Sequence, residues 1–328
     1  MTPKGTAPSW LTWTALWVVY LVWGSTYLAI RVTVETIPPL LSGGVRFFIA
    51  GLIVYVFLLV KRKGFAGVKV TRRELLASTA VGTLLLLGGN GSVNIAEVHV
   101  PSALAALIIA AVPLWVVLLR VVDGDKVARG TMAGVFVGFI GVSVLVLPGG
   151  GSSGASLFHL LLVVVASISW ATGSFFSKKL PLPKDPFLST GIQMLTGGVV
   201  MTIAGVMRGE TSGLDPSQFS AASIAAFVYL IVFGSLLAFT AYVWLLQNAP
   251  ISKVSTYAYV NPVVAILLGW LILDEKVTPA IILGASIIVV AVATVIRIET
   301  RSVAPEPASV PATDSSPDPE LEFAKAQA

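Results

Sequence analysis

Long apolar runs of about twenty residues, separated by short polar or Pro- and Gly-containing segments, dominate the chain. A helix of roughly 20 apolar residues spans the ~30 Å hydrocarbon core of a bilayer. The pattern therefore predicts an all-α membrane protein with ten transmembrane helices. The predicted spans are 10–31, 39–60, 74–97, 102–121, 130–147, 157–178, 187–207, 221–247, 252–273 and 279–297.

The segments at the two ends of this pattern have different predicted roles. The first apolar run lacks a small-residue cleavage site and is followed by further spans, so we interpret it as a membrane helix rather than a signal peptide. Residues 302–328 are rich in Pro, Ala, Ser, Asp and Glu and have no apolar periodicity. Such a composition predicts a disordered tail.

Composition supports the membrane prediction. Hydrophobic residues make up 56% of the 328 residues and charged residues only 11%, whereas soluble proteins carry ~25% charged residues. The net charge of +5 comes mainly from Lys and Arg in short loops, a pattern that sets topology rather than one that binds nucleic acid. The chain contains no Cys, which excludes disulfides and thiolate metal sites, and we expect no cofactor.

Lys and Arg are distributed unevenly between alternate loops. Seventeen lie in the segments on the side of the N-terminus and three on the other side, with Arg46 alone inside a span. Cytoplasmic loops of membrane proteins carry the excess of Lys and Arg. We therefore expect a multi-pass protein of the cell membrane with both termini cytoplasmic.

The second half of the chain repeats landmarks of the first. The aligned pairs are Trp23 and Trp170, and Gly44 and Gly191, at an offset of 147, and Pro113 and Pro262 at an offset of 149. Chance similarity among Gly- and Pro-punctuated apolar runs is the alternative, but the extended register favours duplication. Because each half has five spans, an odd number, the second half is expected to be inverted, as in many secondary transporters.

We therefore predict two inverted five-helix repeats around a central cavity. The expected domains are a cytoplasmic N-terminus (1–9), the first repeat (10–148), an external linker (149–156), the second repeat (157–297) and a disordered cytoplasmic tail (298–328).

Three passages resemble a known family. WGSTYLAIR at 23–31, followed by PPL at 38–40 and by Arg46-Phe47, resembles the opening of the EamA-type exporters of the drug/metabolite transporter superfamily. YAYVNP at 257–262 resembles the Pro-containing ninth span of that family, and LDEK at 273–276 resembles its acidic loop.

The resemblance covers residues 10–297 and implies a fold and an activity. It implies ten helices around a central cavity, with the fourth and ninth packed centrally and the fifth and tenth peripheral. It also implies export of small metabolites, such as amino acids or nucleobases, or of drugs. The first half departs from the family pattern at 123–126, which reads DGDK where the family has a Gly-Glu pair.

Arg46 is a charge predicted deep within a span. It lies seven residues inside the second span, about 10 Å deep at a rise of 1.5 Å per residue. A charge in hydrocarbon costs at least ~2.5–3.5 kcal/mol, so Arg46 should face the protein interior and have a partner. It either anchors a substrate carboxylate or pairs structurally with carbonyls or a carboxylate. The duplicated position is Gln193.

The third span carries a predicted polar face. Asn90, Asn94 and Glu97 follow one another at i, i+4 and i+7, which places them on one side of an α-helix. We expect Glu97 and Arg46 to face the outer half of the cavity and to pair there. Glu97 would carry a proton if export is proton-coupled; a residue that snorkels to the interface is the alternative.

The ninth span and two prolines offer further candidates. Lys253, Tyr257 and Asn261 repeat at i, i+4 and i+8, with Lys253 expected at the membrane surface and the other two toward the cavity. Pro113 and Pro262 each remove a helix hydrogen bond. They are either flexing points for gating or ordinary packing kinks.

Aromatic side chains in the spans either form an amphipathic cavity wall or simply pack and face lipid. The candidate substrate-binding residues are Trp23, Thr26, Tyr27, Arg46, Asn90, Asn94, Trp170, Gln193, Tyr242, Tyr257 and Asn261, with Glu97 as candidate proton carrier and Pro113 and Pro262 as candidate hinges.

A GxxxG pair, Gly134 and Gly138, lies on the fifth span and favours close helix contact. That contact is either within the protomer or in a homodimer. As partners we expect the lipid bilayer and a small-molecule substrate, and no nucleic acid.

Other classes of function lack their sequence features. An ATP-driven pump needs a Gly-Lys-Ser/Thr phosphate loop, which the chain lacks. A hydrolase needs a positioned nucleophile and base, and the only histidines, His99 and His159, lie near span ends. We therefore expect no enzyme. Two hypotheses remain, a secondary exporter and a membrane scaffold or sensor that retains a transporter fold, and saturable flux distinguishes them.

The predicted topology can be tested because the chain has no native Cys. We expect the Ser152→Cys variant to be labelled by a membrane-impermeant thiol reagent applied outside intact cells, because Ser152 lies in the predicted external linker. Labelling from the cytoplasmic side alone would contradict this orientation.

Overall fold

The computed structural model describes residues 9–147, 155–249, 254 and 256–303. Throughout these residues the regular structure is helical, without strands. The N-terminal segment, Ser152 with most of the predicted linker, Lys253 and the tail beyond 303 lie outside the described residues.

The predicted spans appear as helices, and the all-α membrane fold is confirmed. Among the described residues nine helices are long and apolar enough to cross a membrane, and α13 (Tyr257–Leu273) is slightly shorter at 17 residues. The predicted ninth span began at 252, within a segment that is not described. The other unbroken spans are α1 (Ser9–Thr33), α2 (Pro39–Lys61), α7 (Arg129–Val146), α8 (Leu157–Ser177), α9 (Pro186–Met207) and α14 (Pro279–Val303).

Three spans are divided into consecutive segments. The third span consists of α3 (Arg72–Gly82), the π-helix η2 (Thr83–Gly91) and α4 (Ser92–Ala96). The fourth span consists of α5 (Ser102–Ile109) and α6 (Val112–Val122). The eighth span consists of α10 (Ala221–Tyr229), the π-helix η4 (Leu230–Leu237) and α11 (Ala238–Asn248). Two short 3-10 helices, η1 (Phe65–Val68) and η3 (Pro216–Gln218), lie in loops.

Local capping explains where several helices begin. At the start of α3, Thr71 Oγ1 accepts a hydrogen bond from the Glu74 amide (3.2 Å), and the Glu74 carboxylate accepts one from the Thr71 amide (2.7 Å). This reciprocal capping box satisfies amides that have no partner within the helix. At α9, Asp185 accepts from the Leu188 amide at 2.8 Å.

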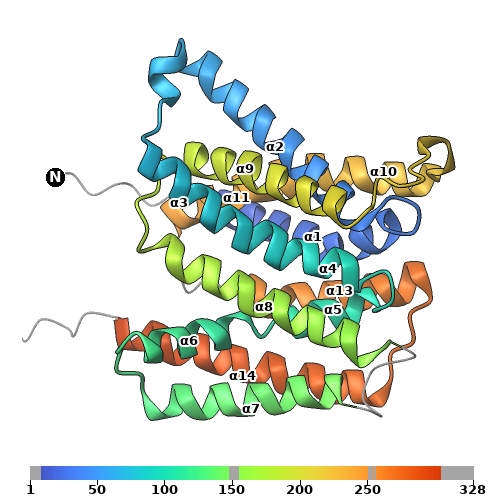
Figure 1. Ribbon diagram of the computed structural model, residues 1–328. Helices are drawn as coiled ribbons and strands as arrows, with labels where there is room; N and C mark the ends of the chain where they lie inside the picture. Colours follow the sequence, from blue (N-terminus) through green and yellow to red (C-terminus); the bar gives the residue numbers. More distant parts are fainter. Residues whose placement is uncertain (1–8, 148–154, 250–253, 255, 304–328) are drawn as a thin grey trace, which may run out of the picture.

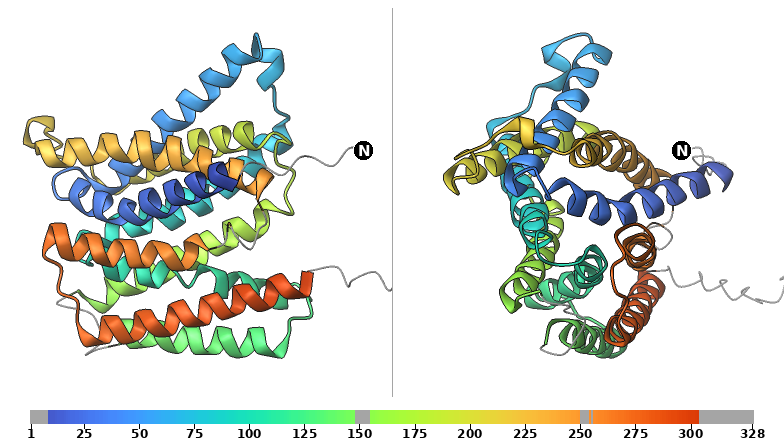
Figure 2. Two further views of the ribbon diagram at one scale, coloured as in Figure 1. Left: turned by 180° about the vertical axis from the view of Figure 1, so that it is seen from behind. Right: turned by 90° about the vertical axis from the view of Figure 1, so that its right-hand side faces the viewer.

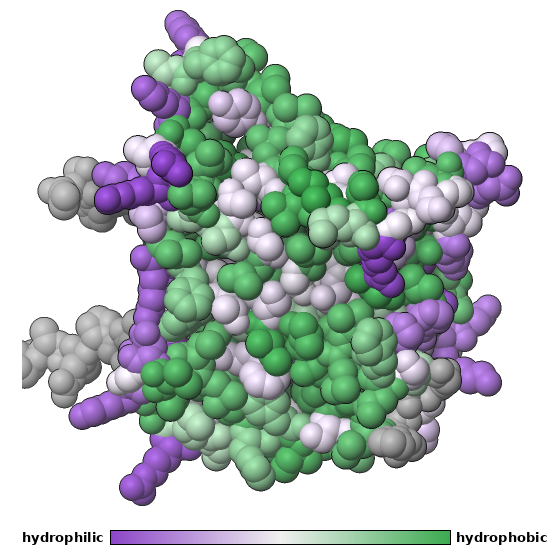
Figure 3. Space-filling view, in the orientation of Figure 1, coloured by the Kyte–Doolittle hydropathy of each residue, from purple (hydrophilic) through white to green (hydrophobic). Residues whose placement is uncertain are grey.

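The spans run roughly side by side between two polar edges. The beginning of α1 and the end of α14 lie at the same edge of the bundle (Figure 1). Hydrophilic side chains gather at the two edges, and apolar side chains cover most of the face between them (Figure 3). Seen along the helices, α7 and α14 lie together at one end of the molecule (Figure 2). This band is the surface that a bilayer would cover.

Glycines bring α2 and α9 into backbone contact. A Cβ atom on Gly44 would lie 2.6 Å from the amide nitrogen of Thr202 and 2.9 Å from the carbonyl oxygen of Gly198. A Cβ atom on Gly51 would lie 2.9 Å from the carbonyl oxygen of Gly191. Small residues permit such close helix approach in membranes, so these positions leave no room for a side chain.

The GxxxG pair of α7 packs within the protomer. A Cβ atom on Gly134 would lie 2.8 Å from Val295 Cγ2 of α14, and one on Gly138 would overlap Leu114 of α6. We expected these glycines to make a close helix contact either within the protomer or in a homodimer. In the structure they contact helices of the same chain.

Two features of the broken spans were not predicted. The hydrophobic pattern did not indicate the π-helices η2 and η4, whose residues 83–90 and 230–237 correspond at the offset of 147. Pro113 coincides with a true break, between α5 and α6, whereas Pro262 lies inside continuous α13. π-Helical turns are frequent at functional sites, and both of these border the cavity described below.

The α2–α9 contact can be tested with Gly44→Ala. We expect the added methyl group to lower stability by about 1–3 kcal/mol, because overpacking forces the backbones apart. Thermal unfolding in detergent measures the effect. The matched control is Gly130→Ala, whose Cβ would meet only the flexible end of Ile298 at 3.2 Å. Equal melting temperatures for the two variants would contradict the close contact.

Candidate functional site

A central cavity of about 210 Å³ lies among the spans. Of the ten spans, α7 and α14 contribute no described residue to its wall, so the fifth and tenth spans are peripheral, as the family resemblance implies. The wall is mainly apolar with a few polar groups, the usual character of a small-molecule site. The predicted site residues in the wall are Trp23, Thr26, Tyr27, Arg46, Asn90, Trp170, Gln193, Tyr257 and Asn261, together with Pro113 and Pro262.

Arg46 is buried in the cavity wall, with 5% of its surface exposed. Its Nε donates a hydrogen bond to Ser235 Oγ of η4 at 3.0 Å. Its Nη1 has no hydrogen-bond partner, and among the described residues no carboxylate forms an ion pair with it. A buried charged group without its full set of partners costs several kcal/mol, so the site is suited to a ligand that supplies an acceptor.

Four aromatic side chains pack together on one side of the cavity. The Trp23 ring lies 5.0 Å from that of Tyr242 and 5.4 Å from that of Tyr257, and the two tyrosine rings are 5.7 Å apart. Phe239 completes the group at 6.4 Å from Trp23. Aromatic pairs at these spacings add stability beyond area burial. Tyr242 is not among the residues of the cavity wall and packs against Trp23 and Tyr257; its role in substrate binding stays a prediction.

Trp170 lies on another part of the wall, against η2. A Cβ atom on Gly89 would lie 2.9 Å from Trp170 Cε3, so the indole ring packs directly on the π-helical backbone. Gln193 of α9 donates a hydrogen bond to Ser189 Oγ at 2.9 Å. The position that duplicates Arg46 is therefore polar but satisfied within its own helix.

The predicted polar face of the third span is divided. Asn90 lines the central cavity, whereas Asn94 lines a separate smaller pocket and Glu97 lines neither. The π-helix η2 ends at Gly91, between Asn90 and Asn94, so its wider turns change the angle between these two residues. Glu97 is the residue that follows the last turn of α4.

Glu97 is fully buried, and neither carboxylate oxygen has a hydrogen-bond partner. Its backbone carbonyl accepts a hydrogen bond from Arg31, and Glu275 and Arg31 are the charged groups that act on its carboxyl. The predicted pair between Glu97 and Arg46 does not form in this structure, because the Arg46 guanidinium is directed to Ser235 instead.

Two acidic residues that we assigned no specific role cap helices of distant segments. Glu275 accepts hydrogen bonds from the amides of Ser102 (2.7 Å) and Ala103 (3.0 Å) at the start of α5. Glu210 accepts from the amides of Leu40 and Leu41, both at 2.9 Å, at the start of α2. Carboxylates stabilise helix N-termini. The acidic loop at 273–276 was the sequence signal for the first, and nothing marked the second.

A bundle of apolar spans around a central, partly polar cavity defines a multi-pass membrane protein of transporter architecture. The chain belongs to the EamA-like transporter family, which matches residues 11–147 and 157–297. This confirms the resemblance to the drug/metabolite transporter superfamily.

Curated relatives cover most of the chain. "Uncharacterized inner membrane transporter YedA" of Escherichia coli (strain K12) is 38% identical over 279 residues, 85% of this chain and 88% of that protein. An "Uncharacterized transporter" of Archaeoglobus fulgidus is 23% identical and covers 87% of this chain and 98% of its own length. "WAT1-related protein At3g02690, chloroplastic" of Arabidopsis thaliana is 23% identical over 88% of this chain and 70% of its own.

One solved crystal structure shares the fold. It is 19% identical, covers 89% of this chain and 98% of its own, and superposes with a TM-score of 0.60.

Proposed function

We propose that this protein is a secondary transporter that exports small amphipathic metabolites, amino acids or related solutes, by alternating access. The observation that carries the proposal is Arg46, a buried guanidinium in the cavity wall with an unpartnered Nη1 and no acidic partner among the described residues. A substrate carboxylate would complement it through a charge-assisted hydrogen bond. The apolar and aromatic wall suits the remainder of an amphipathic solute.

Reciprocal helix contacts support an inverted repeat. Gly44 meets Gly198 and Gly51 meets Gly191. At the offset of 147, Gly191 corresponds to Gly44 and Gly198 to Gly51. Exchanging the two halves therefore turns the contact between Gly44 and Gly198 into the contact between Gly191 and Gly51. A two-fold axis in the membrane plane requires this exchange.

The contact between α7 and α14 repeats this reciprocity. Gly134 meets Val295, and a Cβ atom on Gly284 would lie 2.6 Å from Leu145 Cδ2. At the offset of 150, Gly284 corresponds to Gly134 and Val295 to Leu145. Repeats at 10–148 and 157–297 that rock against each other would open one cavity to either side in turn.

Orientation and direction are part of the proposal. The excess of Lys and Arg on the side of the N-terminus supports cytoplasmic termini. With that orientation Arg46, near the start of α2, lies in the outer half of the membrane. Export, rather than uptake, rests on the family resemblance.

The test is uptake of labelled amino acids, nucleobases and cationic dyes into proteoliposomes that contain wild type or Arg46→Gln. We expect saturable uptake of an anionic or zwitterionic solute, lowered about 10-fold or more in the variant, because a charge-assisted hydrogen bond contributes roughly 1.5–3 kcal/mol. The matched control is Arg208→Gln, which removes an exposed charge at the end of α9 that is not part of the cavity wall and should transport normally.

Absence of saturable flux for every solute, from folded protein, would contradict the transporter proposal and favour a scaffold or sensor. Full activity of Arg46→Gln with an acidic solute would leave a transporter but remove Arg46 from its site.

Glu97 is our candidate proton carrier if transport is proton-coupled. It is fully buried, and both of its carboxylate oxygens lack a hydrogen-bond partner. We expect Glu97→Gln to abolish uptake driven by a pH gradient but to retain substrate exchange, because an amide cannot release a proton.

The control is Glu74→Gln, since Glu74 lies outside both pockets at the start of α3 and Gln also completes a capping box. An unchanged response of Glu97→Gln to the pH gradient would remove the coupling role.

A further inference from the structure

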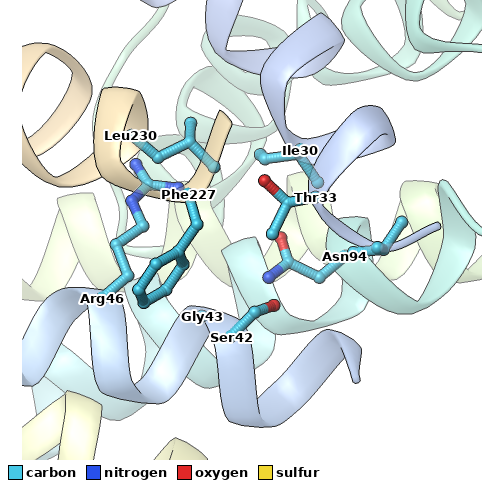
Figure 4. A pocket seen from close by; sticks show the side chains of 9 residues that line it. Ile30, Thr33, Ser42, Gly43, Arg46, Asn94, Phe227 and Leu230 are labelled. Atoms are coloured by element: carbon cyan, nitrogen blue, oxygen red, sulfur yellow. The ribbon is translucent and has the colours of Figure 1, made fainter. Parts of the chain in front are cut away.

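A second, smaller pocket adjoins the central cavity at Arg46. It lies among α1, α2, α4 and the α10–η4 segment, and Arg46 and Ile30 line both spaces. Arg46 and Asn94 stand on opposite sides of it, with Ser42 and Gly43 between them (Figure 4). The pocket is too narrow in this structure to admit a water molecule.

Two buried polar atoms of residues that line this pocket lack partners. One is the donor Nη1 of Arg46, and the other is the acceptor Oδ1 of Asn94, a residue only 3% exposed. The orientation of the Asn94 amide is set by its neighbour, because Nδ2 donates to the carbonyl oxygen of Pro39 at 2.9 Å. Turning the amide over would place two oxygens against each other. Oδ1 is therefore the atom left free.

The other polar side chains of the pocket are already satisfied. Thr33 Oγ1 donates to the carbonyl of Ala29 at 2.7 Å, and Ser42 Oγ donates to that of Pro39 at 3.0 Å. Gly43 has no side chain to add, and a Cβ atom there would lie 2.7 Å from Asn94 Nδ2. One unpartnered donor and one unpartnered acceptor are what remains, and unsatisfied buried groups in native structures mark positions for a ligand or ion.

We propose that Arg46 and Asn94 form an outer subsite for the head group of a zwitterionic solute, whose carboxylate binds Arg46 and whose ammonium binds Asn94 Oδ1. This rests on the proposed transport function and narrows its substrate class to solutes of the amino-acid type. A simple carboxylate would leave Asn94 Oδ1 unpaired, and a simple amine would leave Arg46 Nη1 unpaired. A site built from buried hydrogen-bonding groups rejects ligands that cannot satisfy all of them.

The subsite lies along the route of export. Because Arg46 borders both spaces, a carboxylate held by its guanidinium passes from the central cavity to the outer pocket without losing its charged partner. Phe227 of α10 and Leu230 of η4 close the pocket in this structure. Displacement of the η4 segment, to which Arg46 is tied through Ser235, opens it.

The test is competition in proteoliposomes. Uptake of the labelled panel amino acid is inhibited with L-leucine, with 4-methylpentanoate, which lacks the amino group, and with 3-methylbutylamine, which lacks the carboxylate. We expect wild type to prefer leucine to 4-methylpentanoate by at least about tenfold, because the analogue leaves a buried acceptor unpaired. Asn94→Leu should weaken inhibition by leucine but not inhibition by 4-methylpentanoate, and so remove this preference.

A second variant guards against simple misfolding. Asn94→Asp keeps an acceptor and adds an anion beside Arg46, so 3-methylbutylamine should become a better inhibitor than 4-methylpentanoate. The matched control is Ser223→Ala, which removes another buried hydrogen bond between helices, from Ser223 Oγ to the Val32 carbonyl at 2.7 Å, outside both pockets. It should keep the wild-type preference.

The outcomes separate this proposal from the transport function itself. If uptake persists and Asn94→Leu weakens inhibition by leucine and by 4-methylpentanoate equally, the subsite is overturned but the transport function stands. If wild type shows no preference for leucine over 4-methylpentanoate, the subsite is likewise overturned and the transport function stands. No saturable uptake of any panel solute overturns the transport function and the subsite with it.

Discussion

Two helices from opposite halves of the chain, α2 and α9, touch backbone to backbone through glycines at 44, 51, 191 and 198. In a bilayer, lipid tails are as apolar as the side chains, so helix association depends on close packing rather than on the hydrophobic effect. The glycines provide that packing. Because α2 and α9 lie so close, Arg46 on one and Gln193 on the other reach the same cavity.

The packing of the two halves is reciprocal, but the chemistry of the cavity is not. Arg46 has only a neutral counterpart, Gln193, which bonds within its own helix. Trp23 joins an aromatic cluster, whereas its counterpart Trp170 packs on the η2 backbone. A scaffold with two similar halves therefore surrounds a cavity with a single buried cation in its described wall. Under the proposed function, that asymmetry would give a bound solute a defined orientation.

Buried polar groups fall into two kinds in this protein. The carboxylate oxygens of Glu275 and Oε2 of Glu210 bind helix N-termini through pairs of amides and hold spans in place, although Oε1 of Glu210 has no hydrogen-bond partner. Arg46, Asn94 and Glu97 each retain atoms without partners, at a cost of about 1–3 kcal/mol for each neutral group and more for a charge. Groups of the first kind have a structural role. Those of the second kind cost stability in this structure, and at Arg46 and Asn94 they are the atoms that we propose to bind substrate.

The sequence by itself determined the membrane fold and nearly all span positions, because a bilayer requires continuous apolar helices of fixed length. The span predicted at 157–178 is α8, Leu157–Ser177, and that at 39–60 is α2, Pro39–Lys61. Most of the candidate substrate-binding residues that it identified lie in the cavity wall, since polar residues inside spans face the protein interior.

Only the tertiary structure decided which polar atoms have partners. Helical spacing placed Asn90, Asn94 and Glu97 on one face, but the π-helix η2 ends between Asn90 and the other two, and the three have different surroundings in the structure. The same spacing could not show that Arg46 turns to Ser235, 189 residues away in the chain, rather than to Glu97. Periodicity describes one helix at a time, whereas a hydrogen bond between spans depends on how several helices pack together.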